Sequence, residues 1–248
     1  MMEMHPLLKR AAHQVESLVS RRLVQSWRSH RKFEEQHLGR LLDHLRVDCV
    51  LDVGANIGQY AMMLRDYSGY RGLIISFEPT PEPLRQLRQN SQHDPLWKVE
   101  GIALGNSTGR AKFLTLPTAS EGNSFLALRN PDKPQDQQVE VEVELRRLAD
   151  ILPGLQAKYG FSRPFLKMDT QGFDLQVFAG ATDILPSVVG LQSELSIDPF
   201  YKGAPEWLES LAVYREAGFV LSALVPNNTD WFPRLHEVDC IMYRPESL

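Results

Sequence analysis

Short apolar runs alternate with amphipathic segments over most of this chain. The apolar runs predict buried strands, and the segments between them, with apolar residues spaced three or four apart, predict helices. The predicted strands span residues 49–53, 72–77, 97–104, 165–168 and 188–195, and the main predicted helices span 58–67, 81–92, 174–179 and 205–217. This alternation predicts a parallel sheet with helices on both faces.

The alternation breaks at Gly109. Residues 111–116 and 139–145 have the pattern of strands, and the second strictly alternates Val and Glu, as half-exposed strands do. The stretch between them, 117–138, is polar and aperiodic, so it is either a lid over a substrate or an inert loop. After a short helix at 147–152 and the later elements, strands at 219–225 and 238–243 are joined by a polar loop without a helix, which predicts an antiparallel pair.

Residues 1–46 have the pattern of two helices. They carry nine basic and five acidic residues, a local balance of +4. One interpretation is a basic arm that touches a membrane surface, an acidic carrier or a partner chain, for example in a homodimer. The other, which the interspersed acids favour, is a solvated helix that covers one end of the sheet. We therefore expect a helical arm at 1–46 and one domain at 47–248, with a lid insertion at 117–138.

Composition narrows the class of protein. The 248 residues carry a formal net charge of -4, which gives no electrostatic reason to expect a nucleic-acid partner. Cys49 and Cys240 are the two cysteines, too few for a disulfide framework or a zinc pattern. No apolar run is long enough for a transmembrane segment, and charges interrupt the N-terminal apolar groups, so a cytoplasmic protein is expected.

The stretch from Val50 to Gln59 carries the first candidate chemistry. A strand runs into Gly54, Ala55, Asn56 and Gly58 and then into a helix that begins near Gln59 and Tyr60. Glycines allow a ligand to approach the backbone, and the start of a helix attracts an anionic group. The second strand ends at Glu78, whose carboxylate could accept both ribose hydroxyls of a nucleoside. A nucleotide-like cofactor is therefore expected here.

Two cofactor classes fit this turn. A dinucleotide oxidoreductase has a glycine where this chain has Asn56, and a side chain there obstructs the pyrophosphate. The stretch Asp52-Val53-Gly54-Ala55-Asn56-Ile57-Gly58 instead resembles the first motif of class I S-adenosylmethionine-dependent methyltransferases. That resemblance implies that the turn seats the cofactor carboxylate, that Asp52 accepts its ammonium, and that Glu78 with Pro79 binds the ribose. It also places Ala103 and Leu104 beside the adenine.

A more specific resemblance lies at the fourth large strand. The stretch Lys167-Met168-Asp169-Thr170-Gln171-Gly172 resembles the signature of FkbM-type methyltransferases, and Phe77-Glu78-Pro79 fits the same pattern. The resemblance implies a Rossmann-like class I α/β fold, with a mostly parallel seven-stranded sheet and an antiparallel last strand. It implies methyl transfer from S-adenosylmethionine, usually to a hydroxyl oxygen of a small metabolite, a lipid or a sugar. A silent cofactor-binding scaffold and, less favoured, a nicotinamide-dinucleotide oxidoreductase are the alternatives.

A hydroxyl acceptor needs a base or a metal that removes its proton. Asp169 and Glu194 follow neighbouring strands, so either could be the base, or both could hold Mg²⁺. Asp169 could instead contact the amine of the cofactor, and Glu194 could pair with a basic residue. His236 is a third candidate base. Side chains expected to line the acceptor pocket are Asp198, Tyr201, Trp231 and Phe232.

Overall fold

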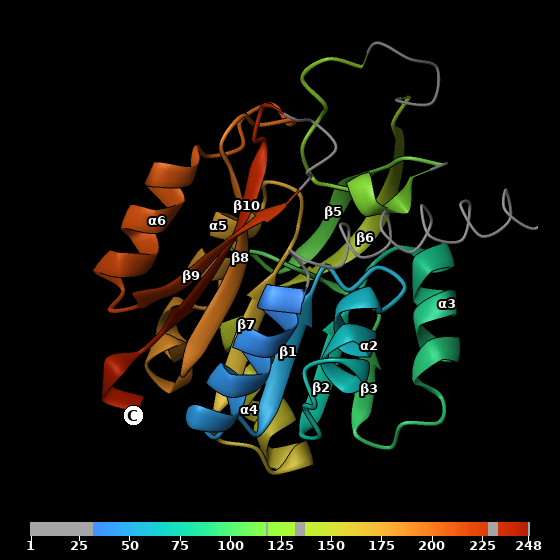
Figure 1. Ribbon diagram of the computed structural model, residues 1–248. Helices are drawn as coiled ribbons and strands as arrows, with labels where there is room; N and C mark the ends of the chain where they lie inside the picture. The colour runs from blue at the N-terminus through green and yellow to red at the C-terminus, as the bar shows by residue number, and fades with distance from the viewer. Residues whose placement is uncertain (1–31, 118, 132–136, 228–232, 248) are drawn as a thin grey trace, which may run out of the picture.

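The computed structural model describes residues 32–117, 119–131, 137–227 and 233–247 (Figure 1). Its main sheet has seven strands in the order β3-β2-β1-β7-β8-β10-β9. β10 is antiparallel to both of its neighbours, and the pairs from β3 to β8 are parallel. The strands are β1 (Cys49–Val53), β2 (Leu73–Phe77), β3 (Trp97–Glu100), β7 (Pro164–Met168), β8 (Gly190–Ser196), β9 (Val220–Asn227) and β10 (Glu237–Tyr243). The predicted fold class is confirmed.

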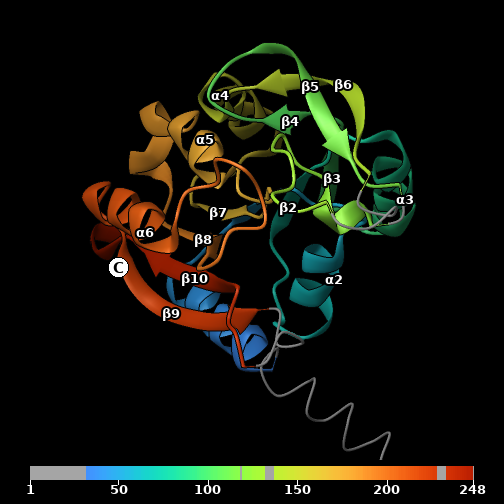
Figure 2. The same ribbon diagram turned by 90° about the horizontal axis from the view of Figure 1, so that it is seen from above.

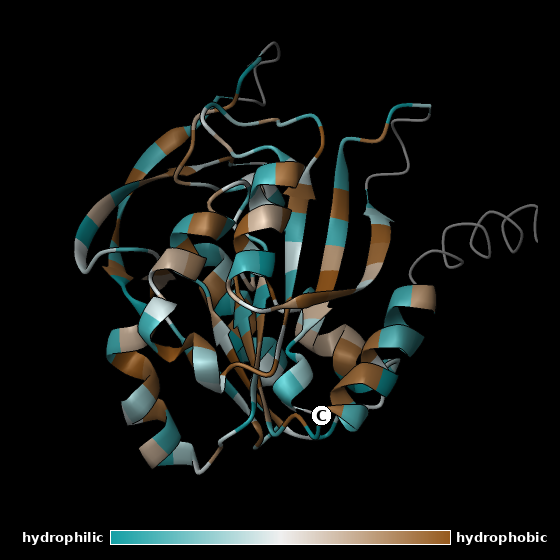
Figure 3. Cartoon of the chain, turned by 90° about the vertical axis from the view of Figure 1, so that its left-hand side faces the viewer, coloured by the Kyte–Doolittle hydropathy of each residue, from teal (hydrophilic) through white to brown (hydrophobic). Residues whose placement is uncertain are grey.

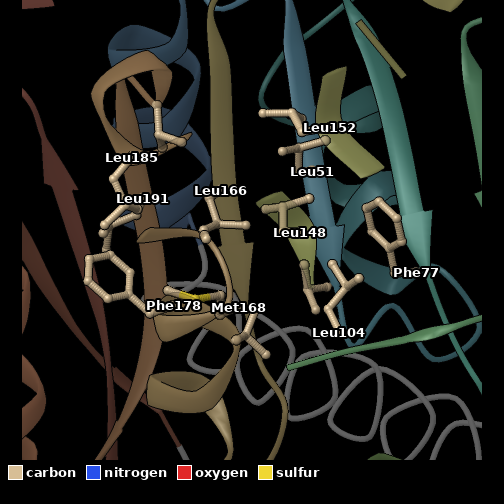
Figure 4. Close-up of a cluster of buried hydrophobic side chains, with 14 of the residues drawn as sticks. Leu51, Phe77, Leu104, Leu148, Leu152, Leu166, Met168, Phe178, Leu185 and Leu191 are labelled. Atoms are coloured by element: carbon tan, nitrogen blue, oxygen red, sulfur yellow. The ribbon is translucent and has the colours of Figure 1, made fainter. Parts of the chain in front are cut away.

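Two layers of helices cover the sheet, because successive side chains of a strand point to opposite faces. Val50 packs in the cluster that includes leucines of helix 32–44, α2 (Gln59–Asp66) and α3 (Pro81–Ser91). Leu51, the next residue of β1, packs in the cluster of α4 (Leu148–Tyr159), α5 (Asp174–Ala179) and α6 (Trp207–Glu216), part of which Figure 4 shows. Both hydrophobic and hydrophilic residues occur along these helices (Figure 3). The result is a three-layer α/β/α arrangement.

Helix 32–44 belongs to one of these layers. The four leucines whose spacing predicted an apolar face are all buried against the sheet: Leu38, Leu41, Leu42 and Leu45. Figure 1 shows this helix in blue in front of the sheet, next to α2. The other predicted helix of the arm, and any dimer contact it makes, fall on residues outside the described part of the chain.

A second, smaller sheet corrects one expectation. The predicted strand at 97–104 is two strands in two sheets, because the chain leaves the main sheet after Glu100. The small sheet has the order β4-β6-β5, with β4 (Ala103–Leu104), β5 (Gly109–Thr115) and β6 (Val139–Arg146). α4 is also longer than the predicted 147–152, since Pro153 is accommodated inside the helix.

The segment 119–131 is the longest described part of the predicted lid. It forms a short 3₁₀ turn at Ser120–Gly122, and a β-bridge joins Leu128 to Tyr201. The ring of Phe125 lies 4.7 Å from that of Phe113 and 4.5 Å from that of Phe173, centroid to centroid. These contacts fasten the segment across the carboxyl edge of the main sheet. Among the residues described, no helix has the length and apolar character needed to cross a membrane.

Candidate functional site

A cavity of about 760 Å³ lies at the carboxyl edge of the main sheet. Figure 2 looks down from above, with the small sheet on one side and β9, β10 and helix 32–44 on the other. We call one part of the cavity the β2 half; its walls include Gly54, Asn56, Glu78, Pro79, Ala103 and Leu104. We call the other part the β8 half; its walls include Glu34, Gln192, Glu194, Glu237 and Asp239. Asp169, at the end of β7, lines the cavity between the two halves because β7 lies between β1 and β8.

The glycines of the turn after β1 are required by packing. Gly54 has a φ of 75°, and a Cβ built there would lie 1.9 Å from the backbone oxygen of Asp169. Gly58 has a φ of 97°, and its Cβ would lie 2.6 Å from the ring of Trp97. Gly54 lines the cavity, whereas Gly58 is not among the lining residues. Gly58 therefore serves the start of α2 and its packing on β3.

Several N–H groups expected to seat a cofactor carboxylate are already engaged. The N–H groups of Gly54 and Ala55 donate to the carbonyl oxygen of Phe77 at 3.2 and 3.0 Å. The N–H of Asn56 donates to Oε2 of Glu78 at 2.9 Å. α2, whose first residues are Gln59 and Tyr60, has no side-chain cap at its N-terminus, and both residues line the cavity. The first turn of α2 is therefore the better seat for an anionic group.

Asn56, at the position of the middle glycine, connects two parts of the site. Its backbone is left-handed, with a φ of 48°, a conformation that asparagine tolerates better than most residues. Its side-chain oxygen accepts a hydrogen bond of 3.0 Å from the hydroxyl of Ser120, in the segment 119–131. The side chain thus ties the turn to the segment 119–131, which we call the covering segment.

Glu78 is held rigidly at the end of β2. Besides the N–H of Asn56, its carboxylate accepts hydrogen bonds from the N–H of Thr80 at 2.9 Å and from the Thr80 hydroxyl. Burial raises the pKa of Glu78, and the hydrogen bonds from Thr80 and Asn56 oppose that rise. The side chain lines the β2 half, where its carboxylate could accept hydroxyl groups of a ligand.

Apolar side chains form much of the β2 half. Pro79, Ala103 and Leu104 line it. Phe113 of β5 and Phe125 of the covering segment also line it, and sequence reasoning missed both as site residues. Nothing in the sequence of β5 shows that its one aromatic side chain faces a cavity, because that depends on where the small sheet sits.

Asp52 does not reach the cavity, which corrects its expected role toward the cofactor ammonium. Its side chain is fully buried and is not among the lining residues. Its Oδ2 accepts a hydrogen bond of 2.9 Å from Ser76, and its Oδ1 lies 3.4 Å from the ammonium of Lys167. Asp52 therefore neutralises a buried lysine beneath the site.

Asp169 and Glu194 are brought together, and an amide joins them. Nε2 of Gln171 donates to Oδ1 of Asp169 at 3.0 Å and to Oε2 of Glu194 at 2.9 Å. The Tyr201 hydroxyl lies 3.0 Å from Oε1 of Gln171 and 2.9 Å from the carbonyl oxygen of Gly122. The sequence pattern alone assigns no role to Gln171. Its function as a bridge depends on the distance between β7 and β8, which the sequence does not show.

The two carboxylates have different neighbours: Asp169 faces a cationic group, whereas Glu194 faces a neutral amide. The ammonium of Lys167 lies 3.4 Å from Oδ2 of Asp169, and Nδ2 of Asn227 donates to Oε1 of Glu194 at 2.8 Å. Burial, and then the negative charge of Asp169, raises the pKa of Glu194 well above its usual range. Burial would lower the pKa of Lys167, but the charges of Asp169 and Asp52 outweigh it and raise that pKa. Glu194 is thus a half-buried carboxyl with raised proton affinity, which is a property of general bases.

These carboxylates do not fit a magnesium site. The two oxygens that face each other, Oδ1 of Asp169 and Oε2 of Glu194, both accept from the same amide of Gln171, and the outer two face Lys167 and Asn227. A divalent cation needs oxygen ligands, whereas these groups are N–H donors. Within the described ranges, no group of three or more His, Cys, Asp or Glu side chains is placed to hold a metal ion. We therefore derive no step through a metal.

His236 receives no support as a base. Its ring stacks on Phe200 at 4.8 Å, its Nδ1 lies 3.1 Å from Oδ2 of Asp198, and it is not among the residues that line the cavity. Asp198 and Tyr201 are not among them either, although Tyr201 contacts Gln171, which is. Trp231 and Phe232 lie outside the described residues.

Comparison with known proteins agrees with the motifs. Methyltransferase sdnD of Sordaria araneosa is 30% identical over 158 residues, 54% of this chain and 60% of that protein. The 31-O-demethyl-FK506 methyltransferase FkbM of Streptomyces tacrolimicus is 27% identical over 162 residues, 55% of this chain and 60% of that protein. Hexuronic acid methyltransferase AglP of Haloferax volcanii is 27% identical over 198 residues, 75% of each chain. The matched part of the chain thus spans 60% of the length of the first two relatives.

The model of the methyltransferase FkbM domain matches residues 52–221. This range contains the turn after β1, Glu78, the Asp169–Gln171–Glu194 bridge and the covering segment. Because the match extends over more than half of the sequence, the chain belongs to the family of FkbM methyltransferase domains.

Proposed function

We propose that this protein transfers a methyl group from S-adenosylmethionine to a hydroxyl oxygen of a small metabolite, a lipid or a sugar. One observation carries the proposal. A single cavity joins a half suited to a nucleoside, with Glu78 and the uncapped start of α2, to a half-buried carboxylate pair, Asp169 and Glu194.

The names of the relatives support methyl transfer to oxygen. One is named for a 31-O-demethyl substrate, and another for hexuronic acid, a sugar acid with several hydroxyl groups. Family membership supports the methyl donor, because the resemblance that includes Lys167–Gly172 implies S-adenosylmethionine.

The β2 half fits the donor by its chemistry. Glu78 would accept hydrogen bonds from the ribose hydroxyls, and the first-turn N–H groups of α2 would donate to the carboxylate of the donor. Ala103, Leu104 and Phe113 would bury the adenine between apolar surfaces. The residues that line the cavity include more acidic than basic side chains. This net negative charge also suits a donor that carries a positive sulfonium.

The bound donor supplies a methyl group on a positively charged sulfur. The acceptor oxygen forms a bond to that carbon as the carbon–sulfur bond breaks, and the bonding pair stays on sulfur. The protein aligns the two reactants and takes the hydroxyl proton. Asp169 and Glu194 are the carboxylates placed to accept it, and the raised pKa of Glu194 favours proton uptake. The ammonium of Lys167 lies 3.4 Å from Oδ2 of Asp169.

Calorimetric titration tests the donor. S-adenosylmethionine and S-adenosylhomocysteine should bind, and NAD should not. Glu78→Ala should weaken binding about tenfold to a hundredfold, since it removes a charged hydrogen-bond acceptor. Exposed Glu82→Ala, on α3, is the matched control and should leave the affinity unchanged. Binding of NAD without S-adenosylmethionine would overturn the proposal.

Transfer of a labelled methyl group to a panel of hydroxyl compounds tests the reaction. Incorporation at oxygen, assigned by NMR of the product, is the expected result. Incorporation at nitrogen would overturn the choice of acceptor atom. Donor binding without transfer to any member of a broad panel would favour a silent cofactor-binding scaffold.

A further inference from the structure

Helix 32–44 contributes a residue to the cavity, although it lies outside the family-matched range, which begins at residue 52. Glu34 lines the β8 half together with Gln192, Glu194 and Asp239. The leucines of the same helix anchor it on the sheet. An element that precedes the matched domain thus forms part of the wall of its site.

Hydrogen bonds fix the position of Glu34. Nε2 of Gln192, a buried residue of β8, donates to Oε1 of Glu34 at 2.7 Å, and the Tyr60 hydroxyl donates to Oε1 of Gln192 at 2.9 Å. The ring of Tyr60 lies 5.2 Å from the ammonium of Lys167. These contacts connect helix 32–44 to the first turn of α2 and to Lys167 at the floor of the site. The carboxylate of Glu34 is therefore held in place in the wall of the cavity.

The β8 half lies on the side of Asp169 away from the half assigned to the methyl donor, so the acceptor should occupy it. Its described walls include four carboxylates: Glu34, Glu194, Glu237 and Asp239. Lys167, the one cationic side chain among the described residues that line the cavity, is already engaged by Asp52 and Asp169. Burial, followed by the charges of Glu34 and Asp169, raises the pKa of Asp239. An anionic acceptor would add another negative charge to this half, whereas an ammonium or a hydroxyl would be attracted.

We propose that Glu34 is a specificity-determining residue that selects acceptors presenting an amine or hydroxyl donor at this end and rejects acceptors with a carboxylate there. The proposal rests on the proposed function, since it assigns the β8 half to the acceptor. Glu34 would recognise the end of a polyhydroxyl acceptor that carries an ammonium group or a hydroxyl able to donate a hydrogen bond.

Binding of three matched sugars tests the proposal. Glucosamine, glucose and glucuronate share a ring and differ in charge, and each is titrated into protein saturated with S-adenosylhomocysteine at pH 7. We expect glucosamine to bind about tenfold more tightly than glucuronate, with glucose between them. Titration of S-adenosylhomocysteine comes first; if that ligand fails to bind, the proposed function fails, independently of the specificity of Glu34.

The variants separate charge from packing. Glu34→Gln keeps the length of the side chain and an oxygen for Gln192, so it should lower the preference for glucosamine over glucuronate several-fold. Glu34→Asp keeps the charge and should retain the preference. Glu35→Gln changes the net charge equally on the same helix, but Glu35 is not among the residues that line the cavity, so the preference should not change. Three results would overturn the proposal: glucuronate binding as tightly as glucosamine, no binding of glucosamine at tens of millimolar, or an unchanged preference in Glu34→Gln.

Discussion

The two halves of the cavity are built in different ways. The β2 half comes mainly from short stretches that each follow a strand end: Gly54–Asn56 with Gln59 and Tyr60, Glu78 with Pro79, and Ala103 with Leu104. The β8 half collects single residues from distant parts of the chain, such as Glu34, Gln192 and Asp239. A half made of contiguous motifs can be recognised in a sequence, whereas a half made of scattered residues cannot.

The chemistry of the halves differs as well. The β2 half combines apolar surface, backbone groups and one anchored carboxylate, Glu78. The β8 half is rich in carboxylates whose hydrogen bonds come from amides of Gln171, Gln192 and Asn227. The first arrangement suits a ligand of constant shape. In the β8 half, a single substitution can change which ligand charge is preferred. We therefore expect the methyl acceptor, rather than the methyl donor, to distinguish this protein from its relatives.

Asp169 lies between the halves, and its removal should have the largest effect. Asp169→Ala should lower methyl transfer about a hundredfold to ten-thousandfold, because it removes a candidate base and uncovers the charge of Lys167. Turnover with labelled S-adenosylmethionine measures this, and exposed Asp66→Ala is the control. Normal turnover in Asp169→Ala would exclude this residue as the base.

Gln171 tests whether the bridge itself matters. Gln171→Met keeps the volume but removes both N–H donors, and we expect turnover to fall about tenfold. The pKa of Glu194 is already raised, so its base form is lost as pH falls through that value. Without the donors the pKa should rise further, and the acid limb of the pH–rate profile should move up by about one pH unit. The groups that also raise this pKa are Asp169, Glu237, Asp239 and Asp174.

Two further variants check this result. Gln171→Asn suits the left-handed backbone, where Gln171 has a φ of 54°, but it is too short to reach both carboxylates, so it should show the same shift. Gln176→Met, on the exposed side of α5, is the matched control. A profile that stays unchanged in both Gln171 variants would show that Glu194 is not the base.

Ser120 should give the smallest effect and tests the covering segment over the β2 half. Ser120→Ala removes the hydrogen bond to Asn56, so binding of S-adenosylmethionine should weaken about threefold to tenfold. Calorimetry measures this, and Ser162→Ala, far from the cavity, serves as the control. A loss as large as that expected for Glu78→Ala would mean that the segment, and not the end of β2, dominates donor binding.

Much of the fold could be predicted from the sequence, because strand and helix periods are local properties. β1 and α5 have the predicted bounds, and the antiparallel last strand followed from a polar loop without a helix. The break between β3 and β4 could not be predicted, since apolar residues occur on both sides of Gly101, at Val99 and Ile102, and only the position of the small sheet divides the stretch.

The sequence by itself determined the fold class, the family and the motif residues that line the β2 half, because these depend on short-range patterns. The tertiary structure decided which of those residues face the cavity: Glu78 does, whereas Asp52 lies beneath it and His236 packs against Phe200. It also decided that Gln171 bridges two carboxylates and that Glu34 reaches the wall. Contacts between strands and helices far apart in the chain leave no periodic signal, so they become visible only when the elements are packed.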